Sequence, residues 1–404
     1  MADAGVGTIK AQRVCKWELC SGCGACVNIC PVQCVKLEED EHGERRAVID
    51  HTHCIGCNMC RKTCPNNGLA EKMKQANPEL VYAGWRKEKT ERRKSSSGGI
   101  ASLLAEYVVQ SGGVVYGVCW QEGKAVYQRA GTGDDVNCFR GSKYVQADGT
   151  WIYKEIEQDI CQRRKVLLTG TPCLIAGVLS YMRQKDPEES YRDYLITVDL
   201  LCHGTVPQSY LQEHISAICH RKEIKFDQIT FRSNMPGENY RFILKEGETN
   251  IYSQRAECDL YFNSFLTSVS IRESCMHCAY KTSNRCGDIT LGDFLGLGKK
   301  EAFAVDKTGI HPSLVLINSD RGQQLLEKIR ERAELYPRTL QEAVDGGPSL
   351  RMEGGGISEN WAGRRKKFRM LYPRMGFEKA AGKSTGDQIF LAVMKDKMKA
   401  VLKR

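Results

Sequence analysis

Two runs of cysteines constrain this chain more than any other feature of its sequence. The first run, at residues 20–31, reads "CSGCGACVNICP", and the second, at residues 54–65, reads "CIGCNMCRKTCP". Cysteines at C-x2-C-x2-C spacing turn three sulfurs toward one face of a cube, and a fourth cysteine before proline is carried to a neighbouring cluster. Each run therefore predicts three ligands of one iron-sulfur cluster and one ligand of the other.

The predicted ligand sets cross between the two runs. A zinc ribbon also uses paired C-x2-C motifs, but two runs of four cysteines that both end in proline favour iron. Cys15 and Cys34 fall outside the spacing and are expected as packed thiols. The segments 34–40 and 44–50 are expected to pair as two strands about a turn. The first [4Fe-4S] cluster is expected on Cys20, Cys23, Cys26 and Cys64, and the second on Cys54, Cys57, Cys60 and Cys30.

The size and composition of the chain limit what else it can be. It has 404 residues, of which 41% are hydrophobic, so it can bury more than one core. Cysteines at ligand spacing, without a secretory signal, predict a cytoplasmic protein with reduced thiols. The formal charge of +10 is offset by about −2 for each loaded cluster, so we expect no nucleic-acid binding. No apolar run predicts a membrane span.

Strands and helices are expected to alternate after residue 95. Apolar positions after residue 99 follow helical spacing, and Gly112-Gly113 ends that helix before an apolar strand at residues 114–120. Further apolar strands are expected at residues 165–170 and 194–202, and each is followed by a helical pattern. This alternation predicts an α/β fold with at least some parallel strands.

We expect the chain to divide into five segments. An α+β domain of the ferredoxin type comes first, a mixed α/β domain in two parts follows a connector, and a basic region comes last. The segments are 1–75 for the two-cluster domain, 76–94 for the charged connector, 95–180 and 181–345 for the two parts of the α/β domain, and 346–404 for the basic region.

Four further cysteines lie where predicted strands end or helices begin. Thr171 and Pro172 suit a helix start and place Cys173 in the first turn, where the backbone favours a thiolate. Ligands of such sheets bind beyond the carboxyl ends of strands. These cysteines either remain protonated packing residues or share a third cubane, with Cys286 as the reserve ligand. The expected inner set is Cys173, Cys202, Cys275 and Cys278.

No nucleotide fingerprint of the G-x-G-x-x-G or P-loop type occurs in the sequence. Two weaker patterns remain. "SSSGGI" offers hydroxyls and glycines at a helix start, which suits a phosphate, and "RGSKYVQ" adds basic side chains. Each pattern alone fits an ordinary surface loop equally well. The candidate cofactor-binding residues are Ser97, Gly98, Gly99, Arg140, Ser142, Lys143, Thr169 and Thr171.

The order and content of five stretches carry a family resemblance. They read "SSSGGIASLLAEYVVQSGGVVYGV", "GSKYVQ", "TGTPCLIAG", "LCHGTVP" and "CMHCAYKTSNRCGDITLGDFLG". Over roughly residues 80–320 they resemble the beta subunit family of coenzyme F-420 hydrogenases and dehydrogenases, here preceded by a ferredoxin module. The resemblance implies FAD in a non-Rossmann α/β domain, a further [4Fe-4S] cluster, and a substrate such as the deazaflavin coenzyme. The chain departs from the family pattern at "GDFLG" and at Cys286.

The cysteine pattern and the resemblance together predict an iron-sulfur flavoprotein oxidoreductase. Relatives of this family also reduce chlorophyll intermediates, so the fold leaves the substrate open. FAD would couple single electrons from the clusters to a two-electron acceptor or donor, and His203 or Asp293 would hydrogen-bond its ring or donate a proton. Expected partners are ferredoxin or another redox protein, a small-molecule hydride acceptor or donor, and further copies of the chain or hydrogenase and dehydrogenase subunits. The alternative is an electron-transfer adaptor without a substrate of its own.

Overall fold

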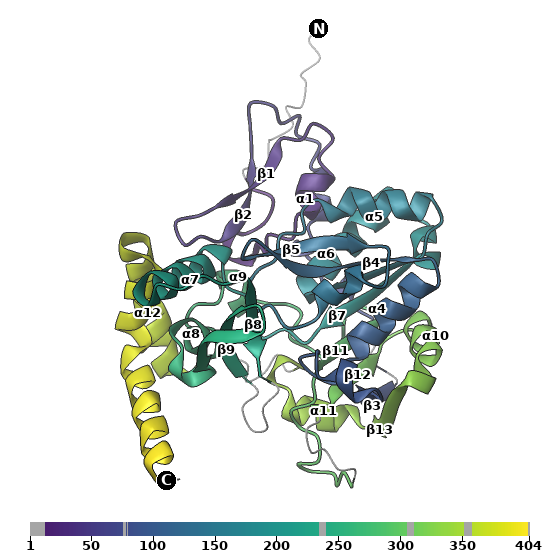
Figure 1. The fold of residues 1–404 in the computed structure, drawn as a ribbon. Helices are drawn as coiled ribbons and strands as arrows, with labels where there is room; N and C mark the ends of the chain where they lie inside the picture. Colours follow the sequence, from purple (N-terminus) through teal and green to yellow (C-terminus); the bar gives the residue numbers. More distant parts are fainter. Residues whose placement is uncertain are drawn as a thin grey trace.

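The protein consists of a small N-terminal module set on a larger α/β body (Figure 1). A computed structural model describes residues 13–75, 78, 80–233, 240–304, 311–350 and 358–402. The predicted strand pair of the module is confirmed, because Val35 pairs with Ile49 and Glu39 with Arg45 in an antiparallel hairpin. The module contains β1 (Val35–Glu39), β2 (Arg45–Ile49), α1 (Ala25–Asn28), α2 (Met59–Thr63) and short 3-10 helices at Trp17–Leu19 and Glu71–Met73.

An eight-stranded sheet forms the centre of the body. In order across the sheet its strands are β13 (Ala333–Arg338), β3 (Leu80–Arg86), β12 (Ser313–Ile317), β11 (Ile289–Asp293), β7 (Leu195–Leu200), β6 (Val166–Gly170), β4 (Val114–Gln121) and β5 (Lys124–Ala130). The four strands β4, β6, β7 and β11 run parallel, and antiparallel strands extend the sheet on both sides. The predicted α/β fold class is therefore confirmed.

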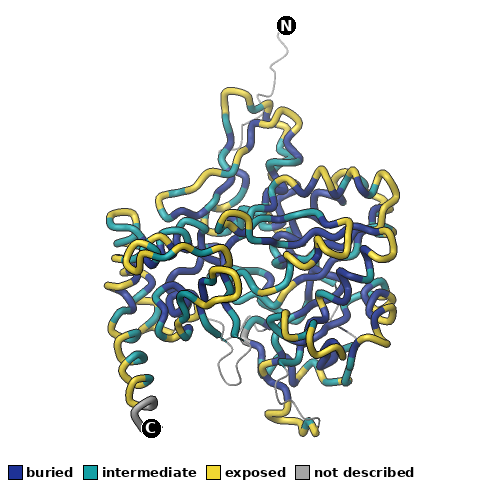
Figure 2. Tube along the Cα trace, in the orientation of Figure 1, coloured by how far each residue is buried: buried dark blue, intermediate teal, exposed yellow. Residues whose placement is uncertain are grey.

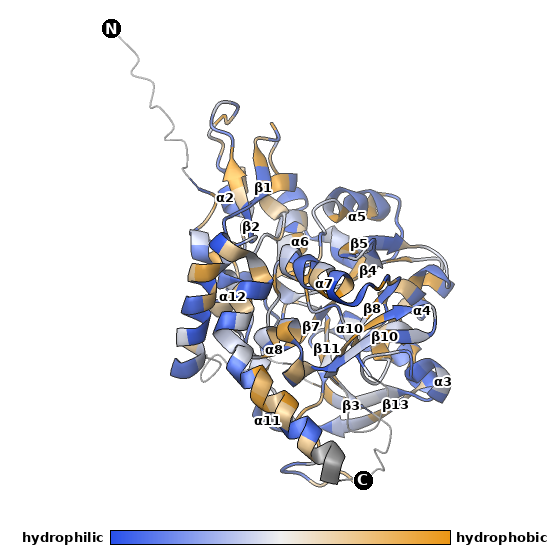
Figure 3. Ribbon diagram, turned by 60° about the vertical axis from the view of Figure 1, so that its left-hand side comes forward, coloured by the Kyte–Doolittle hydropathy of each residue, from blue (hydrophilic) through white to orange (hydrophobic). Residues whose placement is uncertain are grey.

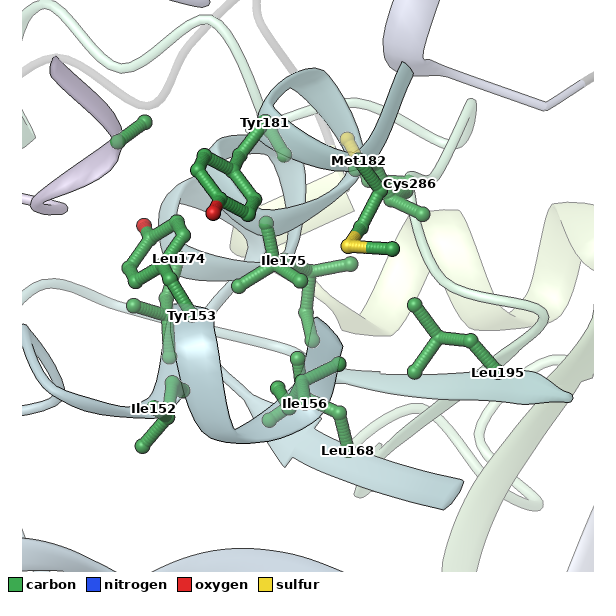
Figure 4. Packing of buried hydrophobic residues seen from close by; sticks show 14 of the residues in the cluster. Ile152, Tyr153, Ile156, Leu168, Leu174, Ile175, Tyr181, Met182, Leu195 and Cys286 are labelled. Atoms are coloured by element: carbon green, nitrogen blue, oxygen red, sulfur yellow. The ribbon is translucent and has the colours of Figure 1, made fainter. Parts of the chain in front are cut away.

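Helices cover both faces of this sheet, because successive residues of a strand point to opposite sides. Leu167 of β6 belongs to the core on one face, and its neighbour Leu168 belongs to the core on the other. Figure 4 shows the second core, in which Ile156 and Ile175 gather around Leu168. The first face carries α4 (Ile100–Gln110) and α10 (Asp320–Lys328), and the second carries α5 (Ile152–Cys161) and α6 (Pro172–Lys185).

A second, smaller sheet and its helices share an aromatic core rich in phenylalanine. Phe231 and Phe242 of the strands meet Phe262 and Phe377 of the helices there. The sheet contains β8 (Gln228–Arg232), β9 (Tyr240–Glu246) and β10 (Thr249–Arg255), and the helices are α7 (Gln208–Lys222), α8 (Leu260–Leu266) and α12 (Glu359–Leu402). The other elements are α3 (Lys89–Arg92), α9 (Glu273–Met276), α11 (Leu340–Gly346) and short 3-10 helices at Asp135–Phe139, Ser190–Asp193, Ala256–Cys258, Arg330–Arg332 and Pro348–Leu350.

The long helix α12 bends at Gly376, whose φ of 73° is in the left-handed region that glycine adopts without strain. Its first half packs against the body, and its second half runs down toward the C-terminus (Figures 1 and 3). Among the described residues, no helix has both the length and the apolar character that crossing a bilayer requires. The exposed apolar side chains on the second half are Phe390, Leu391, Met394 and Met398.

The structure corrects three expectations. The segment 76–94 is more than a connector, because residues 80–86 form β3, a mostly buried strand between β12 and β13 (Figure 2). The division at residue 180 falls inside α6, so the segments 95–180 and 181–345 share one sheet. A disulfide joins Cys119 to Cys138, so the expectation of reduced thiols fails for this pair.

Candidate iron-sulfur and cofactor sites

Two hollows in the N-terminal module are lined by cysteines from both runs. The first is lined by Cys15, Cys20, Cys23, Cys26 and Cys64, and the second by Cys30, Cys34, Cys54, Cys57 and Cys60. Each predicted set of four therefore surrounds one hollow, and each includes the cysteine that comes from the other run. The two loops have matching backbones, because Gly24 and Asn58 both adopt a left-handed conformation just before α1 and α2.

Cys15 and Cys34 lie closer to these hollows than their spacing in the sequence suggests. The spacing predicts packed thiols outside the ligand sets, yet each of the two lines one hollow. The Sγ atom of Cys34 lies 3.5 Å from the Sγ atom of Cys30. Each hollow therefore has four cysteines at ligand spacing and one additional thiol within reach.

The two hollows differ in their access to solvent. Cys20, Cys26 and Cys64 of the first hollow are buried, whereas Cys57 of the second is exposed. The second hollow is also bordered by Ile55, whose side chain is 59% exposed. The second hollow is thus the outer one, and the first faces the body.

The donor sets suit clusters better than single ions. Among the described residues, no three His, Cys, Asp or Glu side chains converge tightly enough to hold one metal ion. The cysteines surround open space instead, and a cubane needs this arrangement because each of its iron atoms takes one sulfur. The backbone N–H of Ala47 also points at the Sγ atom of Cys20 from 3.4 Å, a contact that favours a thiolate.

The structure brings the four cysteines of the expected inner set into one neighbourhood. Burial raises the pKa of Cys202 above its ordinary value, and the nearby Cys275, Cys173 and Cys278 raise it further. Burial followed by Cys275 and Cys173 raises the pKa of Cys278 to about 11. Thiols in such a place stay protonated unless a cationic core stabilises their thiolates. The set therefore has the donors and the burial that a third cubane requires.

The reserve ligand Cys286 lies apart from this set. Figure 4 shows it beside Met182 in the hydrophobic core. Its backbone N–H donates to a carboxylate oxygen of Asp199 at 3.2 Å. Burial raises its pKa, and Asp199 is the next cause. The surroundings of Cys286 are those of a packed thiol.

Helix α6 connects the inner set to the ferredoxin module. Cys173 lies in its first turn, and Gly177 lies one turn later on the same face. A Cβ atom at Gly177 would stand 3.0 Å from the Sγ atom of Cys23, so glycine is what permits the close approach. The hydroxyl of Tyr153 donates to the carbonyl oxygen of Cys23 at 2.7 Å and holds that loop against the body.

The two stretches suspected of binding a phosphate meet at one edge of the central sheet. The backbone N–H of Ser142 donates to the hydroxyl of Ser96 at 2.7 Å. The hydroxyl of Ser97 lies 2.9 Å from that of Ser313, and the N–H of Gly98 donates to the same Ser313 hydroxyl at 3.0 Å. Ser313 pairs across β11 and β12 with Asp293, so the loop borders that carboxylate.

The two basic side chains of this edge have partners within the protein. Lys143 donates from Nζ to the four carbonyl oxygens of residues 138–141, at 2.8–3.1 Å. Burial lowers the pKa of Lys143 to about 7. Arg140 pairs with Glu91 at 2.7 Å and with Glu106 at 3.1 Å. Both cations therefore shape the loop in which they lie.

The remaining predicted site residues belong to other surroundings. Thr169 donates its hydroxyl hydrogen to the carbonyl oxygen of Tyr116 at 3.3 Å. Thr171 precedes α6, but its hydroxyl makes no capping bond and lies 3.4 Å from the Sγ atom of Cys173. Thr171 is therefore a neighbour of the inner cysteine set.

Asp293 and His203 lie on two sides of an aromatic group. Asp293 accepts hydrogen bonds from Nη2 of Arg232 at 2.5 Å and from the hydroxyl of Tyr240 at 2.8 Å. Arg232 also donates to the hydroxyl of Tyr144 at 2.7 Å. Sequence reasoning missed Arg232 and Tyr240, because they lie on the second sheet and carry no local motif. Asp293 is the end of a network that joins both sheets.

His203 contacts the other side of this group. Its Nε2 atom lies 3.2 Å from the carbonyl oxygen of Phe265 and 3.1 Å from the hydroxyl of Ser268. The ring of Phe265 packs against both His203 and Tyr144, with centroids 5.3 Å and 5.1 Å away. Burial lowers the pKa of His203, and Lys281 adds to this effect, so the imidazole is neutral at pH 7.

Family comparisons agree with the arrangement of these sites. Residues 81–152 match the model of the N-terminal part of the coenzyme F420 hydrogenase/dehydrogenase beta subunit, and residues 163–343 match the model of its C-terminal part. Residues 19–67 match the 4Fe-4S dicluster domain. The two beta subunit models together span more than half of the chain.

Individual relatives match shorter stretches. A heterodisulfide reductase-like protein of Archaeoglobus profundus is 30% identical over 104 residues, which are 17% of this chain and 15% of that protein. The chain spans 10–15% of the length of the heterodisulfide reductase relatives. An uncharacterized ferredoxin of Methanocaldococcus jannaschii is 36% identical over 56 residues, which are 14% of this chain and 71% of that protein. A chain of the F420-reducing [NiFe] hydrogenase complex from Methanosarcina barkeri is 16% identical, with a TM-score of 0.48, over 73% of this chain and 94% of that chain.

Proposed function

We propose that this chain, which belongs to the coenzyme F420 hydrogenase/dehydrogenase beta subunit family and carries a 4Fe-4S dicluster domain, is an iron-sulfur flavoprotein oxidoreductase. In this proposal the two ferredoxin-type clusters exchange electrons with a third cluster on the inner cysteine set. Bound FAD supplies the conversion between single electrons and a two-electron acceptor or donor, which cubanes cannot perform. Coenzyme F-420 is the candidate acceptor or donor.

The observation that carries this proposal is the contact between the dicluster domain and α6. Cys23 lies against Gly177, one turn from Cys173. A ligand of the first cluster and a cysteine of the inner set therefore lie along one helix face. An isolated ferredoxin needs no second set of buried cysteines next to its inner cluster, whereas an electron-transfer chain does.

The sheet edge at Ser97 and Gly98 supports the flavin part of the proposal. The hydroxyls of Ser96 and Ser97 and the backbone N–H groups of their loop suit a phosphate, and the start of α4 adds its dipole. Tyr144 and Phe265 offer aromatic surface beside this loop. Asp293, held by Arg232 and Tyr240, and the neutral His203 are the candidates for contact with the isoalloxazine ring.

The test is the anaerobic purification of the full chain, followed by quantitation of iron, sulfide and flavin. We expect about twelve irons for three cubanes and about one FAD per chain. An acceptor screen with the deazaflavin coenzyme, quinones and nicotinamides then tests turnover. Flavin reduction without turnover of any acceptor would favour the alternative, an adaptor that feeds a hydrogenase, dehydrogenase or other reductase. A chain without flavin would contradict both.

The phosphate loop can be tested by a single methyl group. A Cβ atom at Gly98 would stand 2.2 Å from the carbonyl oxygen of Gly84, so Gly98→Ala must displace the loop. We expect the flavin content to fall strongly while the iron content stays unchanged. Gly133→Ala is the matched control, because a Cβ atom there meets no atom within 4 Å. Equal flavin in both variants would place the cofactor elsewhere.

A ferredoxin or another redox protein is the proposed electron partner, and the exposed Cys57 marks where it would dock. Association with hydrogenase or dehydrogenase subunits, or with further copies of the chain, belongs to the same proposal. A cytoplasmic location stays a prediction from the cysteine usage.

A further inference from the structure

A buried arginine stands between the ferredoxin module and the inner cysteine set. Arg272 is 3% exposed and precedes α9. Its Nε donates to the hydroxyl of Thr205 at 2.9 Å, and its Nη1 donates to the carbonyl oxygen of Ser21 at 2.6 Å. Its Nη2 lies 3.8 Å from the Sγ atom of Cys275. One guanidinium thus contacts both the loop of the first cluster and a cysteine of the inner set.

The charge of Arg272 has no carboxylate partner within salt-bridge distance in the described part of the chain, although Arg46, equally buried, pairs with Glu44. A buried cation without a counter-ion is strongly unfavourable. Burial lowers the pKa of Arg272, but the sulfurs of Cys275 and Cys173 overcome this and raise it above its usual value. The negative charge that balances Arg272 therefore comes mainly from thiolates.

We propose that Arg272 stabilises the reduced state of the inner cluster and thereby favours electron flow from the first cluster inward. The inference rests on the third cluster of the proposed function. Reduction transfers one electron from the first cluster to the inner one, breaks no bond, and adds one negative charge beside Arg272. A charged donor at a ligand sulfur favours the more negative state, and so raises the reduction potential.

The contact geometry explains why the inner cluster gains more than the first. Arg272 points at a sulfur of the inner set but reaches the first cluster's loop only through the carbonyl oxygen of Ser21. Electrostatic stabilisation falls with distance, so the two potentials are shifted unequally. Thr205 holds the third arm of the fork and fixes its orientation. Arg272 is thus a positioning residue that sets the order of two potentials.

The experiment is a redox titration of the full chain, followed by low-temperature electron paramagnetic resonance. The signal that Cys278→Ala loses identifies the inner cluster. Arg272→Met removes the charge, so we expect the equilibrium constant for one-electron reduction of that cluster to fall about tenfold, a shift of about 59 mV to lower potential. Arg272→Lys keeps the charge but cannot reach all three partners, so we expect a smaller shift in the same direction.

Arg365→Met is the matched control. Arg365 is also buried and donates to carbonyl oxygens of Val269 and Ile271 in the segment that leads to Arg272, and it pairs with Glu273. It contacts neither Ser21 nor Cys275 in the described structure. Its loss weakens the same segment, so a purely structural role of Arg272 predicts similar behaviour of both variants. Our inference predicts an unchanged midpoint potential in Arg365→Met.

The outcomes separate this inference from the proposed function. Wild-type protein that saturates at about eight irons would refute the inner cluster, and the role of Arg272 with it. Twelve irons in wild type and Arg272→Met with equal midpoint potentials would overturn the role of Arg272 and leave the proposed function intact. If Arg272→Met fails to hold the cluster, Arg272→Lys decides, because a wild-type midpoint potential in that variant contradicts the inference.

Discussion

At the scale of the residue, each hollow of the N-terminal module contains one cysteine more than a cubane needs. Cys34 stands 3.5 Å from Cys30, near enough to replace it as a ligand after a small loop movement. A single substitution can therefore understate the importance of Cys30. The crossing of ligands between the runs has to be tested with this replacement removed.

We expect the double variant Cys30→Ala/Cys34→Ala to lose the cluster on the second run, because Cys54, Cys57 and Cys60 then lack a fourth sulfur. The iron content should fall by about four per chain, and the signal of the first cluster should persist. Cys34→Ala alone is the control and should keep all iron, whereas Cys30→Ala alone should give an intermediate loss. Disappearance of the first cluster instead would show that the ligands do not cross.

Residue patterns reach as far as local spacing reaches. The grouping of the cluster cysteines followed from the sequence, because neighbours in a run stay neighbours in space. Lys143 did not, because a basic residue in a loop can bind a ligand or its own backbone, and here it donates to four carbonyl oxygens. Arg272 and Arg232 carried no sequence signal, since their partners come from distant segments.

At the scale of the element, periodicity predicted the body well. The predicted helix after residue 99 and the strands near residues 114, 165 and 194 all occur. The strand β3 was missed because charged residues follow it at once and suggest a linker, although its own residues are almost all buried. The second sheet was missed because β10 is half exposed and lacks an apolar pattern.

The helices α7 and α12 are joined by a buried histidine, which gives a prediction about pH. His214 lies between Glu378 at 2.5 Å and Asp259 at 3.1 Å. Burial opposes its protonation, but the two carboxylates overcome this and raise its pKa to about 9. Since the folded pKa exceeds the unfolded value, the contribution to stability is full below about pH 6.5 and is lost as the pH rises through about 9.

The shift corresponds to on the order of 3 kcal/mol of unfolding free energy at neutral or lower pH. We therefore expect His214→Asn to lower the thermal midpoint markedly at pH 6 and much less at pH 10, measured anaerobically on the loaded protein. His220→Asn, on the exposed side of the same helix, is the matched control and should change neither value. An equal loss at both pH values would mean that His214 acts by packing alone.

At the scale of the whole molecule, one carboxylate joins the ferredoxin module to the body. Glu44, 1% exposed, lies in the turn between β1 and β2. It accepts hydrogen bonds from Arg46 of the module, from Arg369 of α12 at 2.5 Å, and from the backbone N–H of Glu273 at 3.0 Å. The position of the first cluster beside α6 depends on this attachment, which no local pattern in the sequence reveals.

Glu44→Gln should loosen the module, because it leaves Arg46 and Arg369 buried with a charge that has lost its partner. Removal of one partner from a buried ion pair costs about 3–5 kcal/mol. We expect faster hydrogen exchange across the described residues 13–75 and slower electron transfer from the dicluster domain to flavin, with unchanged iron content. Glu41→Gln is the control, since that side chain lies in the same turn and is 76% exposed. If both variants exchange hydrogen and transfer electrons like the wild type, the attachment lies elsewhere, and Tyr153 with its bond to Cys23 becomes the next element to remove.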